Sequence, residues 1–320
     1  DSFTIAVANA NDAPTITSNA VTTATEDSAY SYTVEASDAD GDTLTMTGTT
    51  VPSWLSFNAA TGVLSGTPAN ANVGTSGNDV VITVTDGNNG QVTDTFTITV
   101  ANTNDAPTVA NAISDASTDE DAAYSLSISN VFTDDDSGDS CTYSMSGAPS
   151  TITLSGTTIS GTPVNADVGT HTIVVTCTDG SSASVSDSYV LTVANTNDAP
   201  TVASPIADVS TAEDASFSLD VTSSFTDVDS GDTLTYTMSG APSALSISSG
   251  TITGSPVNAD VGDHSIVVTA TDGSNAAVSD TFVLTVTNTN DAPTIDSTAD
   301  TTAEEDEAYS YTTVASDVDA

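Results

Sequence analysis

Polar and apolar residues alternate along short segments of the chain with a period of two residues. In residues 30–34, Tyr, Tyr and Val alternate with Ser and Thr, and in residues 95–100 threonines alternate with Phe, Ile and Val. Residues 44–46 and 80–84 show the same pattern. This period, together with the Gly, Pro, Asn and Asp residues between the segments, predicts short β-strands. No segment sustains the 3.6-residue period of a helix.

The pattern of strands and turns recurs at a fixed interval. Asn-Asp-Ala-Pro begins at Asn11, Asn104, Asn197 and Asn290, which are 93 residues apart. The motifs Thr-Asp-Gly, Gly-Thr/Ser-Pro and Asn-Ala-Asn/Asp-Val-Gly each recur in step. About seven short strands in each interval are typical of an immunoglobulin-like sandwich. We therefore expect an all-β chain of tandem seven-stranded β-sandwiches arranged end to end.

The interval divides the chain into whole and partial repeats. Three whole repeats are expected at residues 12–104, 105–197 and 198–290. Residues 1–11 match the last strand of a preceding repeat plus a linker, and residues 291–320 match the start of a following repeat. Neither end piece could bury a core alone, so we interpret the chain as a section of a longer tandem array.

Composition limits the partners that such an array could have. The chain has no Lys or Arg and 44 Asp plus Glu residues, which gives a formal net charge of −44. Without cationic side chains it cannot neutralise phosphates, so neither nucleic acid nor an anionic membrane surface is an expected partner. No apolar run approaches the roughly 20 residues of a transmembrane helix. A hydrophobic content of 37% is too high for a simply disordered chain.

The acidic residues fall in segments that the sandwich topology would bring to the ends of each repeat. If the first strand (A) runs away from the incoming linker, the B–C and F–G loops lie beside that linker, and the A–B turn and E–F loop lie beside the outgoing linker. The end of one repeat, the linker and the start of the next would then converge. The candidate ligands are Asn9, Asn11, Asp12, Asn102, Asn104, Asp105, Asn195, Asn197, Asp198, Asn288, Asn290 and Asp291 in the linkers; Asp38, Asp40, Asp134, Asp136, Asp227, Asp229, Asp317 and Asp319 in the B–C loops; Asp86, Asp179 and Asp272 in the F–G loops; Glu26, Asp27, Glu120, Asp121, Glu213 and Asp214 in the A–B turns; and Asp167 and Asp260 in the E–F loops.

Converging carboxylates without a basic side chain need a counterion. Carboxylate, amide and carbonyl oxygens, with no His or Cys expected nearby, suit Ca²⁺. Mg²⁺ fits less well because it demands a tight octahedron and keeps its waters. We therefore expect Ca²⁺ as the cofactor at the junctions. Residues 38–49 are not an EF-hand loop, because the twelfth position is Thr49 rather than Glu.

These residues resemble the cadherin-like repeats of large bacterial RTX-type surface adhesins, including the dystroglycan-type cadherin-like and putative immunoglobulin families. The resemblance is carried by the Asn-x-Asn-Asp-Ala-Pro linker, the Asp-x-Asp and Thr-Asp-Gly motifs, and residues 52–68. It implies tandem cadherin-like sandwiches that bind Ca²⁺ between successive domains. The linker departs from the usual cadherin pattern, since its first position is Asn and its Pro comes one residue sooner.

Several residues have two readings. Cys141 and Cys177 replace apolar core positions on neighbouring strands C and F, so they form either a cross-strand disulfide or two buried thiols. His171 and His264 are read as surface or strand-start residues. Trp54 is read as core filling rather than as a platform for a glycan. The acids taken to begin the last strand (G) are read as solubilising surface residues: Asp94, Asp187 and Asp280.

The sequence therefore predicts a structural protein rather than an enzyme. The expected function is a calcium-rigidified extender, or stalk, of a giant extracellular adhesin or surface protein, located at the cell surface or secreted. Its expected partners are the neighbouring repeats of the same chain. The alternatives are a repeat subunit of an extracellular filament or sheath of identical chains, and a module that binds a glycan or another surface.

Overall fold

The structure is a computed structural model that describes residues 1–319. The expected partial repeat 291–320 therefore ends one residue outside the described range. All elements of the described chain are β-strands or single-turn 3₁₀ helices, which confirms the all-β prediction. The fold has two compact units: unit 1 comprises residues 1–116, 124–161 and 170–191, and unit 2 comprises residues 117–123, 162–169 and 192–320.

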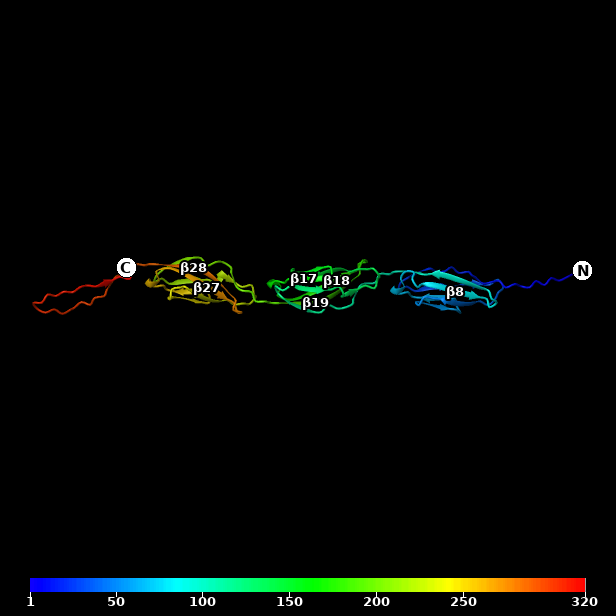
Figure 1. Ribbon diagram of the computed structural model, residues 1–320, viewed down its shortest axis with the longest axis horizontal. Coiled ribbons are helices and arrows are strands. Elements are labelled where there is room, and N and C mark those ends of the chain that lie inside the picture. Colours follow the sequence, from blue (N-terminus) through cyan, green and yellow to red (C-terminus); the bar gives the residue numbers. More distant parts are fainter. Residues whose placement is uncertain (320) are drawn as a thin grey trace. The chain divides into compact units, whose positions relative to one another are not determined.

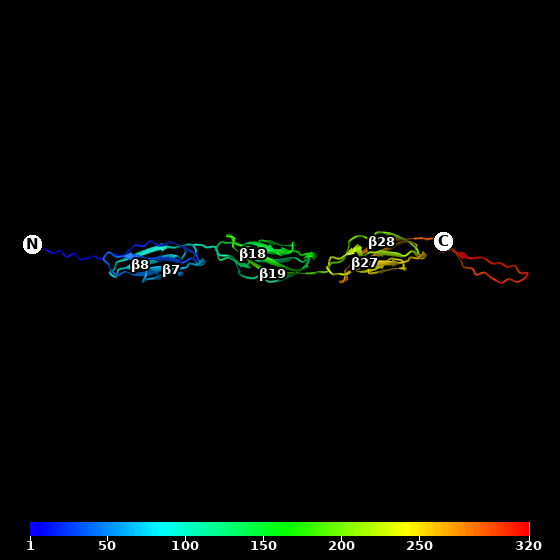
Figure 2. The same cartoon turned by 180° about the vertical axis from the view of Figure 1, so that it is seen from behind.

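The first sandwich lies in unit 1 and contains two facing sheets. One sheet has the strand order β3-β7-β6 and the other β5-β8-β9, and β10 pairs in parallel with β2. Figure 2 labels one strand of each sheet, β7 and β8. The elements are β1 (Thr15–Ile16), β2 (Thr23–Thr25), β3 (Tyr30–Thr33), β4 (Ala36–Ser37), β5 (Thr45–Thr50), β6 (Leu55–Asn58), β7 (Val63–Gly66), η1 (Asn70–Asn72), β8 (Asp79–Thr85), β9 (Gln91–Thr97) and β10 (Thr99–Ala101).

The second sandwich has the same topology, with sheets β12-β19-β18-β15 and β13-β17-β16. Its last strand is unbroken, whereas the first sandwich divides that strand into β9 and β10. The elements are β11 (Thr108–Val109), β12 (Ala116–Asp119), β13 (Tyr124–Ser127), β14 (Phe132–Thr133), β15 (Thr142–Ser146), β16 (Ile152–Ser155), β17 (Thr158–Gly161), η2 (Asn165–Asp167), β18 (Gly169–Thr178) and β19 (Ser184–Ala194).

The third sandwich lies in unit 2, with sheets β21-β28-β27-β24 and β22-β26-β25. Its longest ladder joins β27 and β28, which lie side by side in Figure 1. The elements are β20 (Thr201–Val202), β21 (Val209–Ala212), β22 (Phe217–Asp220), η3 (Thr222–Ser224), β23 (Phe225–Thr226), β24 (Thr235–Ser239), β25 (Leu245–Ser248), β26 (Thr251–Gly254), η4 (Asn258–Asp260), β27 (Gly262–Thr271) and β28 (Ala277–Thr287), followed by the pair β29 (Thr294–Ile295) and β30 (Ala315–Ser316).

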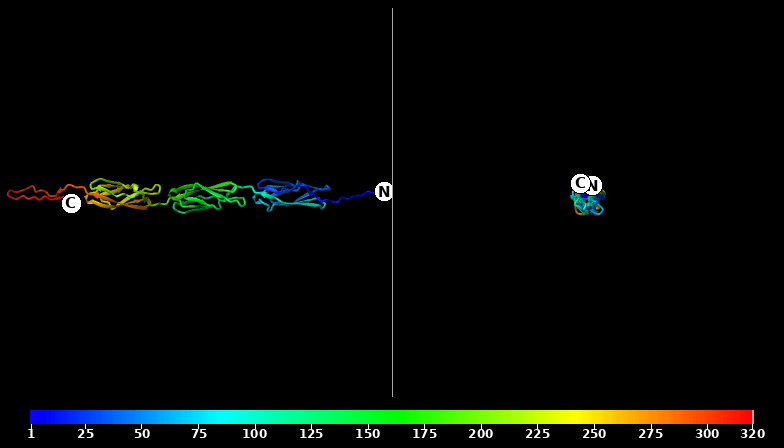
Figure 3. Two further views of the ribbon diagram at one scale, coloured as in Figure 1. Left: turned by 90° about the horizontal axis from the view of Figure 1, so that it is seen from above. Right: turned by 90° about the vertical axis from the view of Figure 1, so that its right-hand side faces the viewer.

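Alternation buries one face of each strand, as the pattern predicts. Tyr30, Tyr32 and Val34 are buried, and the residues between them are exposed. Val80, Ile82 and other apolar residues of both sheets complete the first core. The left view of Figure 3 shows, from above, the strands of each sandwich and the loops that join them. Each core therefore forms between two sheets and leaves both loop-bearing ends free to carry polar residues.

The predicted role of Trp54 agrees with its surroundings. The indole packs against the first core and makes an edge contact with Tyr30, with ring centroids 5.7 Å apart. Its Nε1–H donates to Asn78 Oδ1 at 2.9 Å. Since both the ring and its polar atom are used inside the sandwich, the indole fills the core rather than offering a flat exposed platform.

The acids of the last strand correct one expectation. Asp187 and Asp280 lie within β19 and β28 rather than at their starts, and they do more than keep the surface soluble. Asp187 Oδ2 accepts the backbone N–H of Ile113, and Asp280 Oδ2 accepts that of Ile206. They hold the irregular segments that connect β11 to β12 and β20 to β21, which alternation within a single strand could not reveal. Asp94 Oδ2 accepts the hydroxyl of Tyr32 at 3.3 Å.

The structure adds detail to three further expectations. Residues 1–7, which match a last strand, form no strand. Cys141 lies one residue before β15 rather than in the strand, and it forms a disulfide with Cys177 of β18.

His264 Nε2 lies 2.6 Å from the carbonyl oxygen of Asp260, and this contact fastens the η4 turn. Asn78, at the corresponding position of the first sandwich, binds the carbonyls of Asn72 and Gly74 through its amide.

Candidate cation-binding sites

The linker before each sandwich is bound by the F–G loop. The side-chain amide of Asn11 donates to Asp86 Oδ2 at 2.8 Å. Asn104 binds Asp179 Oδ2, and Asn197 binds Asp272 Oδ2, each at 3.0 Å. These amides, together with loop N–H groups, lower the pKa of all three aspartates below the usual range. The ionised carboxylates of these three aspartates therefore hold the linker to the F–G loop.

The same linker is bound a second time by the B–C loop. The backbone N–H groups of Asp12, Asp105 and Asp198 donate to Oδ2 of Asp40, Asp136 and Asp229 at 2.7, 2.8 and 2.8 Å. The amides of Asn9, Asn102 and Asn195 donate to Oδ1 of the same three aspartates at 2.7, 2.8 and 3.1 Å. These two contacts, and the backbone bond first, lower the pKa of Asp40. The linker Asn and Asp therefore lie against both loops that the topology placed there.

The glutamate of each A–B turn reaches the outgoing linker. Glu26, Glu120 and Glu213 are 1%, 2% and 2% exposed. Their carboxylates accept the N–H groups of Thr103, Thr196 and Thr289 at 3.1, 2.8 and 2.8 Å. The aspartate that follows each glutamate takes a left-handed conformation, with φ of 58°, 56° and 55° for Asp27, Asp121 and Asp214. This turn aims the glutamate inward and leaves the aspartate outside the three-carboxylate clusters described next.

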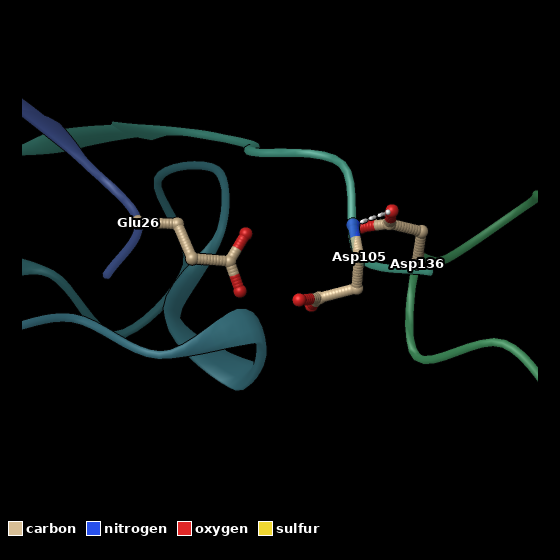
Figure 4. Close-up of side chains that lie close together, drawn as sticks. All are labelled: Glu26, Asp105 and Asp136. Atoms are coloured by element: carbon tan, nitrogen blue, oxygen red, sulfur yellow. Dashed lines mark hydrogen bonds between the residues drawn. The ribbon is translucent and has the colours of Figure 1, made fainter. Parts of the chain in front are cut away.

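Two clusters join a turn glutamate, a linker aspartate and a B–C aspartate. Within unit 1 the cluster is Glu26, Asp105 and Asp136, and within unit 2 it is Glu120, Asp198 and Asp229. In each, one carboxylate oxygen of every member lies within 4.8 Å of the others. Figure 4 shows the carboxylates of Glu26 and Asp105 pointing toward each other while Asp136 holds the Asp105 backbone.

Cation binding is supported by a buried oxygen that has no partner. Glu120 Oε2 and Glu213 Oε2 are buried and accept no hydrogen bond among the described residues. Burial raises the pKa of Asp198, and the charges of Asp121, Asp229 and Asp227 raise it further. A buried, unpaired carboxylate oxygen beside other carboxylates is costly unless a cation satisfies it. The residues present therefore fit a hard divalent cation such as Ca²⁺, with only oxygen ligands.

A second kind of cluster lies between the B–C and F–G loops of one sandwich. Its members are Asp134, Asp139 and Asp179 in unit 1 and Asp227, Asp232 and Asp272 in unit 2, and a related group is Asp38, Asp40 and Asp42. Oδ2 of the first residue in each group is buried and unpartnered among residues 1–319. Sequence reasoning omitted Asp42, Asp139 and Asp232. A Gly-Asp pair after each Asp-x-Asp motif was the available signal.

In the E–F loops, the predicted ligands Asp167 and Asp260 each make a local bond with one carboxylate oxygen. Their Oδ2 atoms accept the backbone N–H groups of Val164 and Val257, which closes the 3₁₀ turns η2 and η4. Neither residue belongs to a cluster found within the described chain. A carboxylate three residues ahead satisfies the free N–H at the start of such a turn, and that local bond sets its direction.

The first residue of the same turn extends toward the B–C loop that follows it in the chain. Asn165 Nδ2 donates to Asp229 Oδ1 at 3.0 Å within unit 2, and Asn258 Nδ2 donates to Asp319 Oδ1 at 3.3 Å. In unit 1, Asn70 Nδ2 donates to the carbonyl oxygen of Asp135. Sequence reasoning missed these three residues, although an Asn opens the Asn-Ala-Asn/Asp motif every time.

The C-terminal linker repeats part of the arrangement. The Asp291 N–H donates to Asp319 Oδ2, and Asp319 N–H donates to Asp317 Oδ1 at 3.0 Å. Burial raises the pKa of Asp291, with smaller contributions from Asp319, Asp214, Glu213 and Asp317. The amide of Asn290 binds the carbonyl oxygen of Asp291. No side-chain bond of Asn288 is found within residues 1–319.

The sites and fold define a class of protein: tandem β-sandwiches with acidic, oxygen-lined clusters at the linkers. Residues 13–101, 106–194 and 199–287 match the family described as Putative Ig domain, and the chain belongs to that family. The chain is also similar to the "Serine-rich adhesin for platelets" of Staphylococcus aureus strain MRSA252, with 35% identity over 171 residues, 53% of this chain and 12% of that protein. The same adhesin of strain USA300 has 35% identity over 171 residues and is covered to 7%.

Solved structures confirm the fold class. Mouse cadherin-23 EC22-24 has a TM-score of 0.53 and 19% identity, and the match covers 88% of this chain and 100% of that chain. A protocadherin gammaB7 EC3-6 cis-dimer structure has a TM-score of 0.56 and 18% identity, covering 96% and 84%. The predicted extracellular or cell-surface location agrees with the adhesin relatives. Within residues 1–319, no helix has the length and apolar composition that a membrane span requires.

Proposed function

We propose that this chain is a calcium-rigidified extender of an extracellular surface protein, with a mechanical rather than an enzymatic role. The match covers 12% of the strain MRSA252 adhesin, and most of this chain belongs to Putative Ig domain repeats. The proposed task is to space another part of the protein from a surface. The proposed repeat boundaries are 12–104, 105–197 and 198–290, with the linkers as the points where bending would occur.

The observation that carries the proposal is the unpartnered oxygen of Glu120. That carboxylate is 2% exposed and lies within 4.8 Å of carboxylate oxygens from Asp198 and Asp229. The three residues come from an A–B turn, a linker and a B–C loop, so a cation held by them fixes three segments at once. Since the sequence contains no Lys or Arg, its own side chains offer no strong cation for this position.

The residues that would hold Ca²⁺ form two groups. The turn glutamate, linker aspartate and B–C aspartate provide the first, and Asp134, Asp139 and Asp179 or their counterparts provide the second. The cation supplies positive charge and oxygen coordination, while the Asn amides already hold the linker against the loops. Each junction is therefore partly assembled by hydrogen bonds, and the cation removes the remaining repulsion. Extracellular Ca²⁺ modules have Kd values of about 10⁻⁴–10⁻³ M, which suits an extracellular protein.

The test measures the melting temperature and small-angle scattering of the whole chain in CaCl₂ and in EGTA. At a Ca²⁺ concentration tenfold above Kd, each site adds about 1.4 kcal/mol to the free energy of unfolding. We expect EGTA to lower the melting temperature and to shorten the mean particle length. Solutions with NaCl or MgCl₂ at the same ionic strength control for charge screening, which a chain of net charge −44 also feels. Equal curves in CaCl₂ and EGTA would contradict the proposal.

A further inference from the structure

The second sandwich contains a disulfide that the other two sandwiches lack. Cys141 and Cys177 are 36 residues apart in the sequence, and their Cα atoms are 5.2 Å apart. Cys177 is fully buried and pairs with Tyr143 in the β15–β18 ladder. The corresponding positions in the third sandwich hold Leu234 and Ala270. An apolar pair therefore fills the same place without a covalent bond.

The two cysteines of the disulfide are close in sequence to two carboxylates of one cluster. Cys141 follows Asp139 by two residues, and Cys177 precedes Asp179 by two residues. Both aspartates lie in unit 1 in the cluster with Asp134, within 4.8 Å. A Cβ atom on Gly180 would lie only 3.3 Å from Asp139 Oδ1, so the two loops are in close approach at this point. The disulfide ties together the bases of the loops that carry these acids.

Three carboxylates at this spacing repel one another when no cation is present. Repulsion favours separation of the B–C and F–G loops, and a cation must then bring them back together at a cost in free energy. A covalent bond behind the loops limits that separation, so less of the binding energy is lost to reorganisation. The third sandwich has to resist the same repulsion without a covalent bond, through packing and the β24–β27 ladder.

We propose that Cys141–Cys177 is a positioning pair that raises the Ca²⁺ affinity of the Asp134, Asp139 and Asp179 cluster. This inference depends on the calcium function proposed above. Because coupling between two sites is reciprocal, bound Ca²⁺ also stabilises the disulfide against reduction. Exposure to a reductant therefore weakens cation binding at this sandwich and leaves the third sandwich unchanged.

The test follows two internal reporters by NMR during a titration with Ca²⁺ alone. The N–H groups of Ser181 and Ala183 donate to Asp179 Oδ1, and those of Ser274 and Ala276 donate to Asp272 Oδ1. We expect reduction of the disulfide to weaken binding about tenfold at the first pair and to leave the second unchanged. The variant C141L/C177A, which copies the third sandwich, should behave like the reduced protein.

A transfer variant separates positioning from general stability. Adding L234C/A270C to C141L/C177A should move the affinity gain to Ser274 and Ala276. A tenfold coupling also lowers the reduction potential of Cys141–Cys177 by about 30 mV in saturating Ca²⁺, which thiol labelling in redox buffers would measure. If Ca²⁺ shifts both reporter pairs, and its affinity is the same for the oxidised and the reduced protein, this inference fails and the proposed function stands. If neither pair responds to millimolar Ca²⁺, this inference fails, and the proposed function then depends on Ca²⁺ binding at the separate Glu120, Asp198 and Asp229 cluster.

Discussion

Asn197 donates its side-chain amide to Asp272 Oδ2 at 3.0 Å, across 75 residues of sequence. The bond joins a linker to the F–G loop of the sandwich that follows it. The same contact occurs at Asn104 and Asp179, also at 3.0 Å. The linker thus has an attachment to its sandwich that needs no cation, and this attachment fixes where the other acids of the linker must lie.

Replacing Asn197 with Ala should lower the melting temperature of the third sandwich by a few degrees even in EGTA. The amide is the first cause of the low pKa of Asp272, ahead of the bonds from loop N–H groups. A carboxyl group with a lowered folded-state pKa stabilises the fold above its unfolded pKa of about 3.9 and loses that effect as pH falls through the folded value. The difference between wild type and variant should therefore be full at pH 6 and shrink below about pH 4.

Thermal unfolding from pH 2.5 to 7 checks this expectation. Asn104→Ala is the matched control, because it removes the same bond in unit 1 and should leave the third sandwich unchanged. A difference that grows as the pH falls would contradict the assigned bond.

Replacing Asp198 with Asn should change stability in opposite directions with and without Ca²⁺. Burial raises the pKa of Asp198. A carboxyl group with a raised folded-state pKa stabilises the fold fully below about pH 3.9 and loses that contribution as pH rises through the folded value. In EGTA at pH 7 the variant should melt higher than wild type, because one repelling charge is gone.

In saturating Ca²⁺ the order should reverse, because the variant lacks one anionic ligand. Both effects are measured by thermal melts of the same variant in EGTA and in CaCl₂ at a concentration of about 5–10 times Kd. Asp263→Asn removes a charge from β27, where Asp263 Oδ1 accepts the Thr285 hydroxyl, and should show no such reversal. The same order in both buffers would argue against a cation at Asp198.

The sequence was sufficient to predict the strands and most of the cluster residues. Alternation identified the buried faces, and the sandwich topology brought the Asn-Asp linker to the B–C and F–G loops. In the E–F loop it overlooked Asn165, which donates to Asp229, and it did not show that Asp167 closes the turn. Both are polar residues of one 3₁₀ turn, and only backbone geometry decides which side chain closes the turn and which extends outward.

A similar limit applied to Asp280. Its position in β28 alternates as a surface residue would, yet it accepts the N–H of Ile206 from the irregular segment between β20 and β21. Ile206 is 74 residues from Asp280 in the sequence, and nothing local to Asp280 reports the path of that segment. Contacts between the last strand and an irregular crossing segment therefore have to come from the structure.

Replacing Asp280 with Ala should destabilise the third sandwich equally with and without Ca²⁺. Ile206 is 8% exposed, so its N–H would be left without an acceptor in a mostly buried place. Leaving such a donor unsatisfied costs about 1–3 kcal/mol. In a domain of this size, each kcal/mol of lost stability lowers the melting temperature by roughly 4–8 °C. Asp280→Asn keeps an acceptor oxygen and should recover most of the loss, whereas a Ca²⁺-dependent effect would place Asp280 in a cation site.

Replacing Glu120 with Gln provides the sharpest separation of ligand and structural roles. Glu120 Oε1 accepts the Thr196 N–H at 2.8 Å, while Oε2 is buried without a partner among the described residues. Gln keeps an oxygen acceptor for Thr196 but replaces the second oxygen with an NH₂ group, which cannot bind a cation. We expect Ca²⁺ affinity at the Asp198 and Asp229 cluster to fall about tenfold or more, by calorimetric titration of the whole chain. In EGTA the melting temperature should stay the same or rise, because a buried charge is lost.

Glu26→Gln should produce the same loss of Ca²⁺ affinity in unit 1 and leave the unit 2 cluster intact. An unchanged titration in both variants would mean that the buried glutamates are tolerated without a cation, and the calcium junction would then have no ligand at its centre.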